Sequence, residues 1–333
     1  MQVSVIVITR DEAPRLALAL AALEDSEAEV IVVDDGSSDS TRDVVAEVGR
    51  PIVRVCHDAA RGRSEARNAG AEVASGDVLL FVDGDVVVAP DLVPRHREAH
   101  RAASDTLGRG EQYHLRCTRF FRDPRTGIPM PGHEDRVARM GATLPRSLVT
   151  EDQVRHDFES ITRRAEPGIY PGAGPRLLAE VELAGLRSHA GCEVSWVAAA
   201  GHNFSVPRPL FLAAGGFDPA MTINEHRELA LRLIACGGRM RVVDGARSYH
   251  LTHRSGWRDP LDDNDWELQL WRKHPRRAVM LLSVFWRSLA NDPLIPPSAR
   301  LTSLDALAAA ARGDIDYDYE ALRRDHPKLG VLA

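Results

Sequence analysis

Two aspartates separated by a single glycine, Asp83 and Asp85, directly follow the apolar run Val78–Val82. Two carboxylates at ~5 Å repel by about 3 kcal/mol at an effective dielectric constant of ~20, and a divalent cation between them removes that cost. Carboxylate and diphosphate oxygens suit Mg²⁺ or Mn²⁺, and Gly84 would let a phosphate approach the backbone. Because Asp-Gly is also a common turn, a simple turn is the alternative for this motif.

Polar residues also follow two earlier apolar runs. Thr9 and Arg10 come directly after the first run, and the acidic segment Asp34-Asp35-Gly36-Ser37 comes directly after the second. A carboxylate in that segment could accept hydrogen bonds from a nucleobase N–H or from ribose hydroxyls. The alternative is a cap for the helix expected to begin near Ser40, and the two roles are compatible.

A third group of polar residues is basic. Arg61, Arg63 and Arg67 lie with Asn68 around the start of an expected helix. The amino terminus of a helix together with arginine side chains suits an anionic ligand. A solvated, arginine-rich helix face is the alternative.

Alternating strands and helices position these groups within the first hundred residues. Strands are expected at the short β-branched runs 3–8, 29–33, 52–56 and 78–82, and helices at 12–24, 40–48, 64–74 and 90–102. This alternation predicts βαβ units and a parallel sheet. Ligands of such sheets bind beyond the carboxyl ends of the strands, so the polar groups are expected to converge on one edge.

The remainder of the chain is less regular. Residues 105–190 carry clusters of Gly and Pro with one helical stretch near 151–164, which predicts an irregular, substrate-shaping segment. Later, helices are expected at 208–214 and 224–235, a strand at 239–243, a histidine-bearing loop at 249–257, and an amphipathic helical tail from about 264.

Composition excludes several classes of protein. The 42 Lys and Arg residues against 48 Asp and Glu give a net charge of −6, which argues against a nucleic-acid partner. Four cysteines without a CxxC pair signal no zinc knuckle, and we expect them to be reduced core residues. No apolar run reaches the ~20 residues that a membrane span needs, and we expect no leader peptide. A soluble, cytoplasmic protein is expected, with peripheral membrane contact or a homo-oligomer left open for the C-terminal helices.

Taken together, these motifs resemble the nucleotide-sugar half of family 2 glycosyltransferases of the GT-A fold. The resemblance rests on segments 3–9, 33–39, 64–70 and 80–85, and on Gly215-Gly216-Phe217-Asp218 followed by Glu225. It implies an α/β, Rossmann-like, mostly parallel sheet flanked by helices, with a helical C-terminal extension. It also implies a nucleoside-diphosphate sugar donor, UDP- or GDP-linked, and a divalent cation, Mn²⁺ or Mg²⁺.

The resemblance also assigns roles along the chain. Residues 1–105 would be the nucleotide-sugar-binding half, 106–258 the acceptor-binding and catalytic half, and 259–333 the helical extension. Asp85 would bind the metal directly, Asp83 would touch the ribose or the sugar, and Thr9, Arg10 and Asp35 would hold the base or ribose. The residues assigned to the nucleotide sugar are Thr9, Arg10, Asp35, Arg63 and Asp83.

The chain departs from the family at the start of the expected catalytic helix. Family members usually carry Glu-Asp there, with the Asp as general base, whereas this chain has Glu225-His226. His226 begins an apolar helix face, so it is either a core histidine or a neutral imidazole base. Alternatively, Glu225 or Glu228 takes the acceptor proton or binds acceptor hydroxyls.

The stretch 224–240 and the following Tyr249-His250 also resemble polypeptide N-acetylgalactosaminyltransferases, a retaining relative. That match implies His250 as a further metal ligand, with His253 as the substitute, and a surface loop is the alternative for both. A neutral imidazole beside a carboxylate and a diphosphate favours Mn²⁺ over Mg²⁺. Inversion is favoured over retention, but the missing catalytic Asp leaves the stereochemical outcome open.

The expected function is a metal-dependent glycosyltransferase that moves a sugar to an acceptor hydroxyl of a glycan, lipid, peptide or natural product. A histidine- and arginine-rich middle segment is the candidate to face the acceptor: His114, His133, His156, Arg163 and Arg164. A nucleotidyltransferase is a weaker alternative, since its glycine-rich phosphate loop is missing at 9–14. A non-catalytic sugar-nucleotide-binding module is a third, supported by the Glu225-His226 departure.

Overall fold

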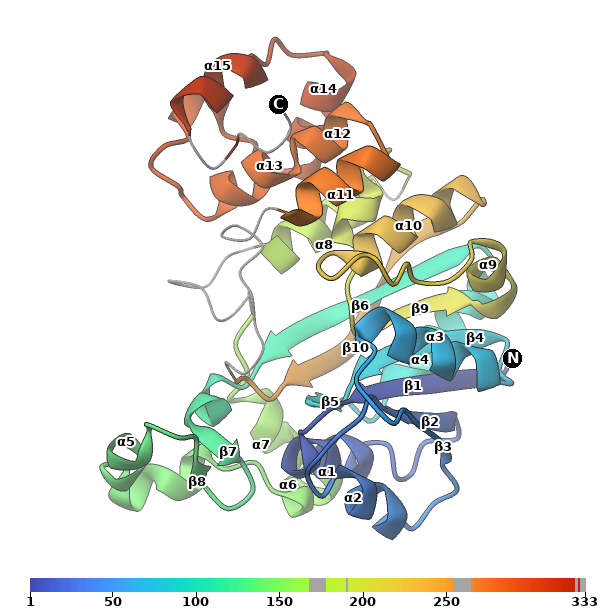
Figure 1. The fold of residues 1–333 in the computed structure, drawn as a ribbon, viewed down its shortest axis with the longest axis vertical. Coiled ribbons are helices and arrows are strands. Elements are labelled where there is room, and N and C mark those ends of the chain that lie inside the picture. Colours follow the sequence, from blue (N-terminus) through green and yellow to red (C-terminus); the bar gives the residue numbers. More distant parts are fainter. Residues whose placement is uncertain (168–177, 190, 254–264, 327–328, 330–333) are drawn as a thin grey trace.

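The large sheet of the protein is mixed and has eight strands. The computed structural model describes residues 1–167, 178–189, 191–253, 265–326 and 329. Within them the strand order is β3-β2-β1-β4-β9-β6-β10-β5, and β7 pairs with β8 in a separate ribbon. Helices pack on both faces of the large sheet (Figure 1). The expected α/β architecture is therefore confirmed, although the second half of the sheet is less parallel than expected.

The first half of the chain alternates strand and helix as expected. Its elements are β1 (Val3–Thr9), α1 (Ala13–Ala21), β2 (Glu29–Asp34), α2 (Thr41–Glu47), β3 (Val53–Cys56), α3 (Arg63–Val73), β4 (Val78–Asp83) and α4 (Leu92–Ala102). Strand β1 pairs in parallel with β2 and β4, and β2 pairs in parallel with β3. Successive side chains of a strand point to opposite faces: Val5 and Val7 join the core that includes α1 and α4, whereas Ile6 joins the core on the α3 side. Both faces are therefore buried, which explains the unbroken apolar runs.

The second half of the sheet corrects three expectations. Its strands are β5 (Val86–Val88), β6 (Thr106–His114), β9 (Phe204–Pro207) and β10 (Arg239–His250). Strand β6 lies in the stretch expected to be irregular, β9 was not expected, and β10 continues through His250 where a loop was expected. Strand β10 is parallel to β6, whereas β9 and β5 pair antiparallel with their neighbours.

The glycines Gly108 and Gly110 explain why the sequence pattern did not predict β6. A Cβ added at Gly110 would lie 2.1 Å from Oδ1 of Asn203, and one at Gly108 would lie 2.4 Å from Oγ of Ser205. Because β9 crosses so close to β6, glycine is required where a strand pattern would carry β-branched residues. The continuation of β10 is similarly concealed by an irregularity in its pairing with β6, which includes Gly245 at a φ of +74°.

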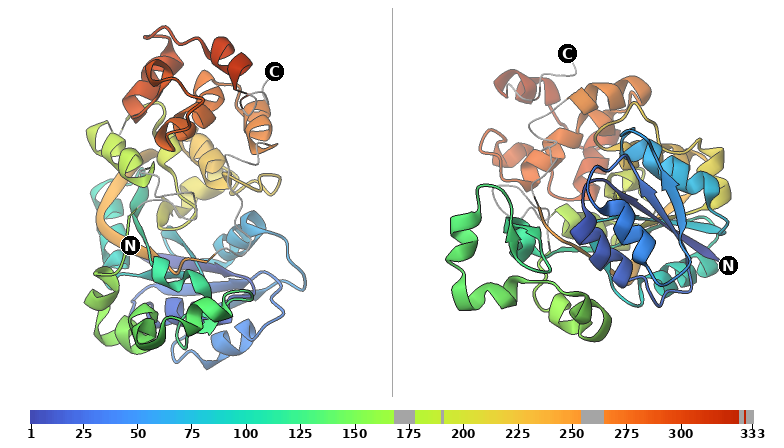
Figure 2. Two further views of the ribbon diagram at one scale, coloured as in Figure 1. Left: turned by 90° about the vertical axis from the view of Figure 1, so that its left-hand side faces the viewer. Right: turned by 60° about the horizontal axis from the view of Figure 1, so that its bottom comes forward.

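The segment between β6 and α8 projects from one end of the sheet (Figure 2). It contains η1 (Arg116–Phe120), β7 (Phe121–Asp123), β8 (Ile128–Pro129), α5 (Glu134–Ala138), η2 (Gly141–Ser147), α6 (Glu151–His156) and α7 (Phe158–Thr162). The helix expected near 151–164 is thus two helices. Asp157 separates them and caps α7, since its side chain accepts a hydrogen bond from the backbone N–H of Ser160.

The rest of the chain is mainly helical. Its elements are α8 (Leu178–Ser188), η3 (Ser195–Ala198), α9 (Arg208–Ala213), α10 (Glu225–Ala235), α11 (Asp265–Lys273), α12 (Arg277–Met280), α13 (Leu282–Leu289), η4 (Pro297–Ala299), α14 (Leu304–Arg312) and α15 (Tyr319–Asp325). Helices α11–α15 form the expected C-terminal extension, which stacks beyond α8 and α10 (Figure 1). The expected boundary at 258 lies outside the described residues.

Two smaller expectations concern cysteines and membranes. All four cysteines are free. Cys117 and Cys192 are half-buried and pack against the core, but Cys56 and Cys236 are exposed, so the expected core placement is wrong for these two. Cys56 ends an edge strand and Cys236 caps the end of α10. In the part of the chain that the structure describes, no helix has both the length and the apolar character needed to cross a membrane.

Candidate functional site

The carboxyl ends of β1 and β4 meet at one edge of the sheet. Ile8 is in register with Asp83, and the backbone N–H of Gly84 donates to the carbonyl of Ile8 at 2.8 Å. A Cβ at Gly84 would lie 2.9 Å from Oγ1 of Thr9. The glycine therefore makes room for Thr9, whereas the sequence suggested room for a phosphate. Thr9 is buried, and its hydroxyl oxygen has no hydrogen-bond partner among the described residues.

Asp85 lies between two histidines that come from the far end of the chain. Its Oδ2 is 3.3 Å from Nε2 of His250 and 2.8 Å from Nε2 of His253. The pairing of β5 with β10 places Val86 opposite His250, so strand register brings the carboxylate and the imidazole together. His253 follows two residues after the neighbouring Leu251, whose N–H donates to the carbonyl of Asp85 at 2.8 Å.

This cluster has the donor set of a metal site. One ligand atom from each of Asp85, His250 and His253 lies within 4.8 Å of the others. The remaining carboxylate oxygen, Oδ1 of Asp85, is buried without a partner in the described chain, and such an atom is costly unless a ligand satisfies it. One carboxylate and two imidazoles suit a borderline transition-metal ion. The residues present therefore fit a divalent cation.

Electrostatics keep Asp85 ionised. Burial alone would raise the pKa of Asp85, but His250 and His253 outweigh burial and hold that pKa well below its usual range. For His253, burial lowers the pKa, while the hydrogen bond to Asp85 and the charge of Asp85 raise it above the usual value. Because metal ligands must be deprotonated, cation binding here would compete with a proton on His253.

A buried arginine connects this edge to the start of α10. Nη2 of Arg67 donates to Oδ1 of Asp83 at 2.9 Å, and its Nη1 donates to Oε1 of Glu225 at 2.8 Å. Arg67 and Glu225 are only 1% and 3% exposed. Burial raises the pKa of Glu225, but Arg63, His226 and Arg67 hold it well below its usual range. Oε2 of Glu225 is buried and has no partner in the described residues.

Two further histidines complete the edge. Nδ1 of His202 lies 3.7 Å from Oδ2 of Asp83, and its ring stacks on that of His250 at 6.4 Å between centroids. His114 ends β6 opposite His250 and meets its ring edge-on at 5.4 Å. Burial lowers the pKa of both His114 and His202 to about 3. His114 was expected to face an acceptor, whereas no sequence pattern indicated His202, which the antiparallel pairing of β9 with β4 places near Asp83.

The predicted nucleotide-binding residues lie at the neighbouring strand ends. Both carboxylate oxygens of Asp35 are engaged: Oδ1 contacts Nδ1 of His57 and accepts from the N–H of Arg61, and Oδ2 accepts from the N–H of Gly62, each at 2.8 Å. Burial raises the pKa of Asp35, but these hydrogen bonds outweigh burial and lower it. In this structure Asp35 therefore holds the loop that leads into α3 by hydrogen bonds to its backbone. Its predicted contact with a nucleobase or ribose stays a prediction.

The remaining predicted residues are Arg10 and Arg63, which are exposed, and Glu228, which is buried. Nη2 of Arg63 donates to the carbonyl of Thr222 at 2.9 Å, and its Nε lies 3.7 Å from Oε1 of Glu225. Glu228 lies apart from Glu225, since its carboxylate pairs with Arg232 at 2.6 Å and with His274 at 3.0 Å. Glu228 thus binds neighbouring helices together. The structure places Arg63 beside the candidate site.

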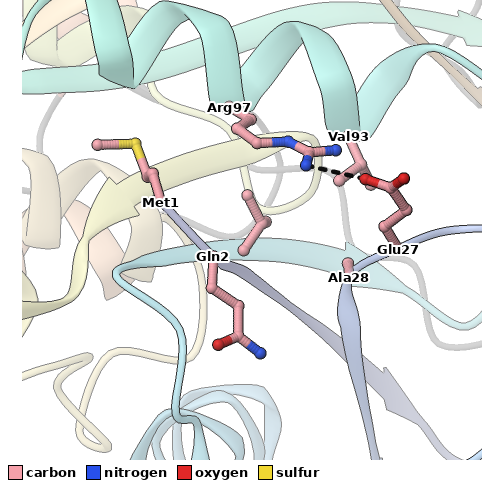
Figure 3. Close-up of a pocket in the computed structure, with 7 residues that line it drawn as sticks. Met1, Gln2, Glu27, Ala28, Val93 and Arg97 are labelled. Atoms are coloured by element: carbon pink, nitrogen blue, oxygen red, sulfur yellow. Dashed lines mark hydrogen bonds and ion pairs between the residues drawn. The ribbon is translucent and has the colours of Figure 1, made fainter.

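One hollow in the protein surface lies away from the candidate site. It is lined by Met1, Gln2, Val3, Glu27, Ala28, Val93 and Arg97 (Figure 3). Val3 and Ala28 lie at the amino ends of β1 and β2, which is the opposite edge of the sheet from Asp83. An ion pair of 3.0 Å between Arg97 and Glu27 closes one side of the hollow. Because it is remote from the acidic and histidine residues, this hollow is no part of the candidate site.

Sequence comparisons identify relatives of the amino-terminal part. Residues 4–143 match the family Glycosyl transferase family 2. The uncharacterized glycosyltransferase YfnE of Bacillus subtilis is 36% identical over 156 residues, which cover 44% of this chain and 38% of the relative. The succinoglycan biosynthesis protein ExoO of Rhizobium meliloti is 29% identical over 238 residues, covering 68% of this chain and 53% of ExoO. The chain thus spans between a third and about half of the length of these relatives.

Comparison of folds extends the likeness over most of the chain. TarS of S. aureus, residues 1–349, in complex with UDP-GlcNAc matches with a TM-score of 0.52 and 16% identity, covering 84% of this chain and 67% of TarS. The complex of the same TarS fragment with UDP matches with a TM-score of 0.51 and 15% identity. At such identity the match concerns the fold. Residues 4–143 therefore resemble glycosyltransferase family 2, and the chain as a whole has a GT-A-like fold.

Proposed function

We propose that this protein is a divalent-cation-dependent glycosyltransferase that moves a sugar from a nucleoside-diphosphate sugar to an acceptor hydroxyl. The observation that carries the proposal is the junction of two clusters at one sheet edge. Asp85, His250 and His253 form a cation-binding set, and Asp83 and Glu225, bridged by Arg67, lie beside it. The TarS complexes with UDP and UDP-GlcNAc support a sugar-nucleotide donor for this fold.

The donor side of the site is assigned as follows. Asp85 and His250, with His253, would hold Mn²⁺ or Mg²⁺, and the mixed oxygen and nitrogen donors favour Mn²⁺. A cation bound there supplies Lewis-acid stabilisation of the negative charge that develops on the leaving diphosphate. The nucleotide-sugar residues proposed are Thr9, Arg10, Asp35, Arg63 and Asp83. Arg63 is exposed at the start of α3, where its charge and the helix terminus both favour an anion.

The acceptor side would begin at α10. Glu225 and His226 are the proposed catalytic pair, since Oε2 of Glu225 and Nδ1 of His226 are buried polar atoms without partners in the described chain. Glu225 or His226 would orient or deprotonate an acceptor hydroxyl of a glycan, lipid, peptide or natural product, with inversion as the favoured outcome. The three-part division at 105 and 258, the likeness to polypeptide N-acetylgalactosaminyltransferases and any oligomer through the C-terminal helices stay predictions.

Replacement of Asp85 by Asn tests the proposal. We expect this variant to lose Mn²⁺-dependent release of UDP from UDP-sugars or of GDP from GDP-sugars, together with the thermal stabilisation that sugar nucleotide plus Mn²⁺ gives by mass action. Asp25→Asn is the matched control, because it removes the same charge from an exposed residue after α1. Full cation-dependent turnover in Asp85→Asn would overturn the assignment. Donor binding without any turnover in the wild-type protein would instead favour the non-catalytic alternative.

A further inference from the structure

The first turn of α10 contains Arg227, whose guanidinium N–H groups almost all have hydrogen-bond partners. Nε of Arg227 donates to the carbonyl of Val197 at 2.7 Å, and its Nη2 donates to Oε1 of Glu182 at 2.9 Å. Nη1 donates to Oδ1 of Asn224 at 2.9 Å and contacts Nε2 of His226 at 2.7 Å. The guanidinium is also stacked over the ring of Trp286 at 4.7 Å. Four of the N–H groups of this guanidinium thus have a partner, and these contacts together with Trp286 hold it in place.

This contact determines where the proton of His226 lies. A guanidinium has hydrogen-bond donors only, so Nε2 of His226 must accept the hydrogen bond from Arg227. A neutral imidazole carries one proton, which is then on Nδ1. The ring is neutral near pH 7, since burial lowers the pKa of His226 to about 4, with Arg227 and Arg67 lowering it and Glu225 opposing them. The lone pair that a base would need is therefore already occupied.

Nδ1 of His226 faces the candidate site. It is buried without a hydrogen-bond partner in the described residues, and the nearest carboxylate oxygen, Oε1 of Glu225, lies 3.9 Å away. A Cβ built on Gly201 would lie 3.6 Å from this nitrogen and 3.3 Å from Nη2 of Arg67. Arg67 in turn binds Asp83 and Glu225. The absent side chain of Gly201 therefore leaves space between the imidazole N–H and the Arg67 cluster.

We propose that His226 is a hydrogen-bond donor, through Nδ1–H, to a hydroxyl oxygen of the transferred sugar, and that Arg227 is the positioning residue that fixes this tautomer. The proposal rests on the proposed function and refines it. Glu225 Oε2 is the acceptor of the pair and His226 is the donor, so together they can hold two polar groups of one substrate. His226 replaces the family's Asp in position and takes a different chemical role.

The C-terminal half of the chain supports this arrangement. Glu182 comes from α8 and is 2% exposed, and Trp286 comes from α13 and is 3% exposed. Both contact the guanidinium of Arg227. Since a guanidinium held in a buried ion pair and against an indole loses its freedom to rotate, the helical extension acts on the site through Arg227.

The tautomer is measured directly by ¹⁵N NMR of the full chain labelled at histidine. The His226 signals are assigned from their loss in His226→Leu. At pH 7 we expect a protonated Nδ1 and an unprotonated Nε2 in the wild-type protein, and a shift of the proton toward Nε2 in Arg227→Gln. Arg227→Lys, which keeps a donor, should restore the wild-type pattern. Arg232→Gln is the matched control, because Arg232 lies on the same helix and also pairs with a buried carboxylate, Glu228.

Binding separates a donor from a base. The amide nitrogen of Asn can occupy the place of Nδ1, so His226→Asn should bind UDP-GlcNAc within about threefold of the wild-type affinity, whereas His226→Leu should lose about tenfold. UDP, which lacks the sugar, should bind all three proteins equally. Titration calorimetry with Mg²⁺ gives these affinities, and circular dichroism checks that the variants are folded.

Two results would overturn the inference. A proton on Nε2 of His226 in the wild-type protein would refute the tautomer whatever the substrate is. An equal loss of UDP and UDP-GlcNAc affinity in His226→Leu would refute the sugar contact. If the wild-type protein binds no sugar nucleotide, the proposed donor and the sugar contact fail together, while the NMR experiment still decides the role of Arg227.

Discussion

Replacing Arg67 by Met removes the guanidinium that pairs with both Asp83 and Glu225 of the candidate site. Arg67 is 1% exposed, and its partners differ in burial: Glu225 is 3% exposed and Asp83 is 26% exposed. Breaking a buried ion pair by removing one partner costs about 3–5 kcal/mol. Since water can solvate Asp83 and Arg63 stays 3.7 Å from Glu225, we expect the lower end, about 3 kcal/mol.

The stability loss in Arg67→Met should also depend on pH, in a direction that the pKa of Glu225 determines. In the wild-type protein the pKa of Glu225 is held well below its usual value, so this carboxylate stabilises the fold above its unfolded pKa and ceases to do so as the pH falls through the folded pKa. Without Arg67 that pKa should rise, although Arg63 and His226 still oppose the effect of burial. The stability difference between Arg67→Met and the wild-type protein should therefore shrink as the pH falls from 7 toward 4.

Urea unfolding followed by tryptophan fluorescence measures both effects. Arg97→Met is the control, because Arg97 pairs with Glu27, which is 80% exposed, and exposed pairs contribute at most about 1 kcal/mol. Adding Glu225→Gln to Arg67→Met removes the buried charge that Arg67 no longer neutralises and should recover part of the loss. An Arg67→Met variant that is no less stable than Arg97→Met, or that gains nothing from Glu225→Gln, would refute the electrostatic reasoning.

Two other perturbations test the scaffold. His96 and His100 are buried, and each makes a hydrogen bond with Oγ of Ser205; burial lowers the pKa of His96 to about 4 and that of His100 to about 3. Because unfolded histidine titrates near 6.5, the free energy of unfolding should fall below that pH, by about 2 kcal/mol per histidine at pH 5. Equal urea midpoints at pH 7 and pH 5 would contradict this. Gly84→Ala places a Cβ 2.9 Å from Thr9 and should cost about 1–3 kcal/mol, seen as a lower Tm, whereas Gly49→Ala, with its nearest neighbour at 4.0 Å, should leave Tm within a degree or two.

The amino-terminal half could be predicted because its local signals agree. Strands β1, β2 and β4 are short apolar runs that end in the polar residues Thr9, Asp34 and Asp83, and each helix carries a helical pattern. Parallel pairing then places those strand ends at one edge. Local patterns and the global fold thus point to the same answer, and the position of Asp85 followed from them.

The other half of the site depends on contacts that no local pattern encodes. Strand β9 has four residues, and β6 carries glycines that its close approach to β9 requires. His202 reaches Asp83 because the chain reverses before β9, and the tautomer of His226 depends on a guanidinium held by α8 and α13. The sequence named His226 as a base or a core residue, since spacing along a helix tells nothing of what lies opposite it.

Strand pairing, more than loop conformation, sets the geometry of the proposed cation site. Strand β5 has only three residues, and its register with β10 places Val86 opposite His250. A shift of one residue would turn His250 to the other face of the sheet and move it away from Asp85. Because β10 is also paired with β6 along most of its length, that shift would break a long ladder. The large sheet therefore fixes the position of His250 relative to Asp85, although the two lie 165 residues apart in the chain.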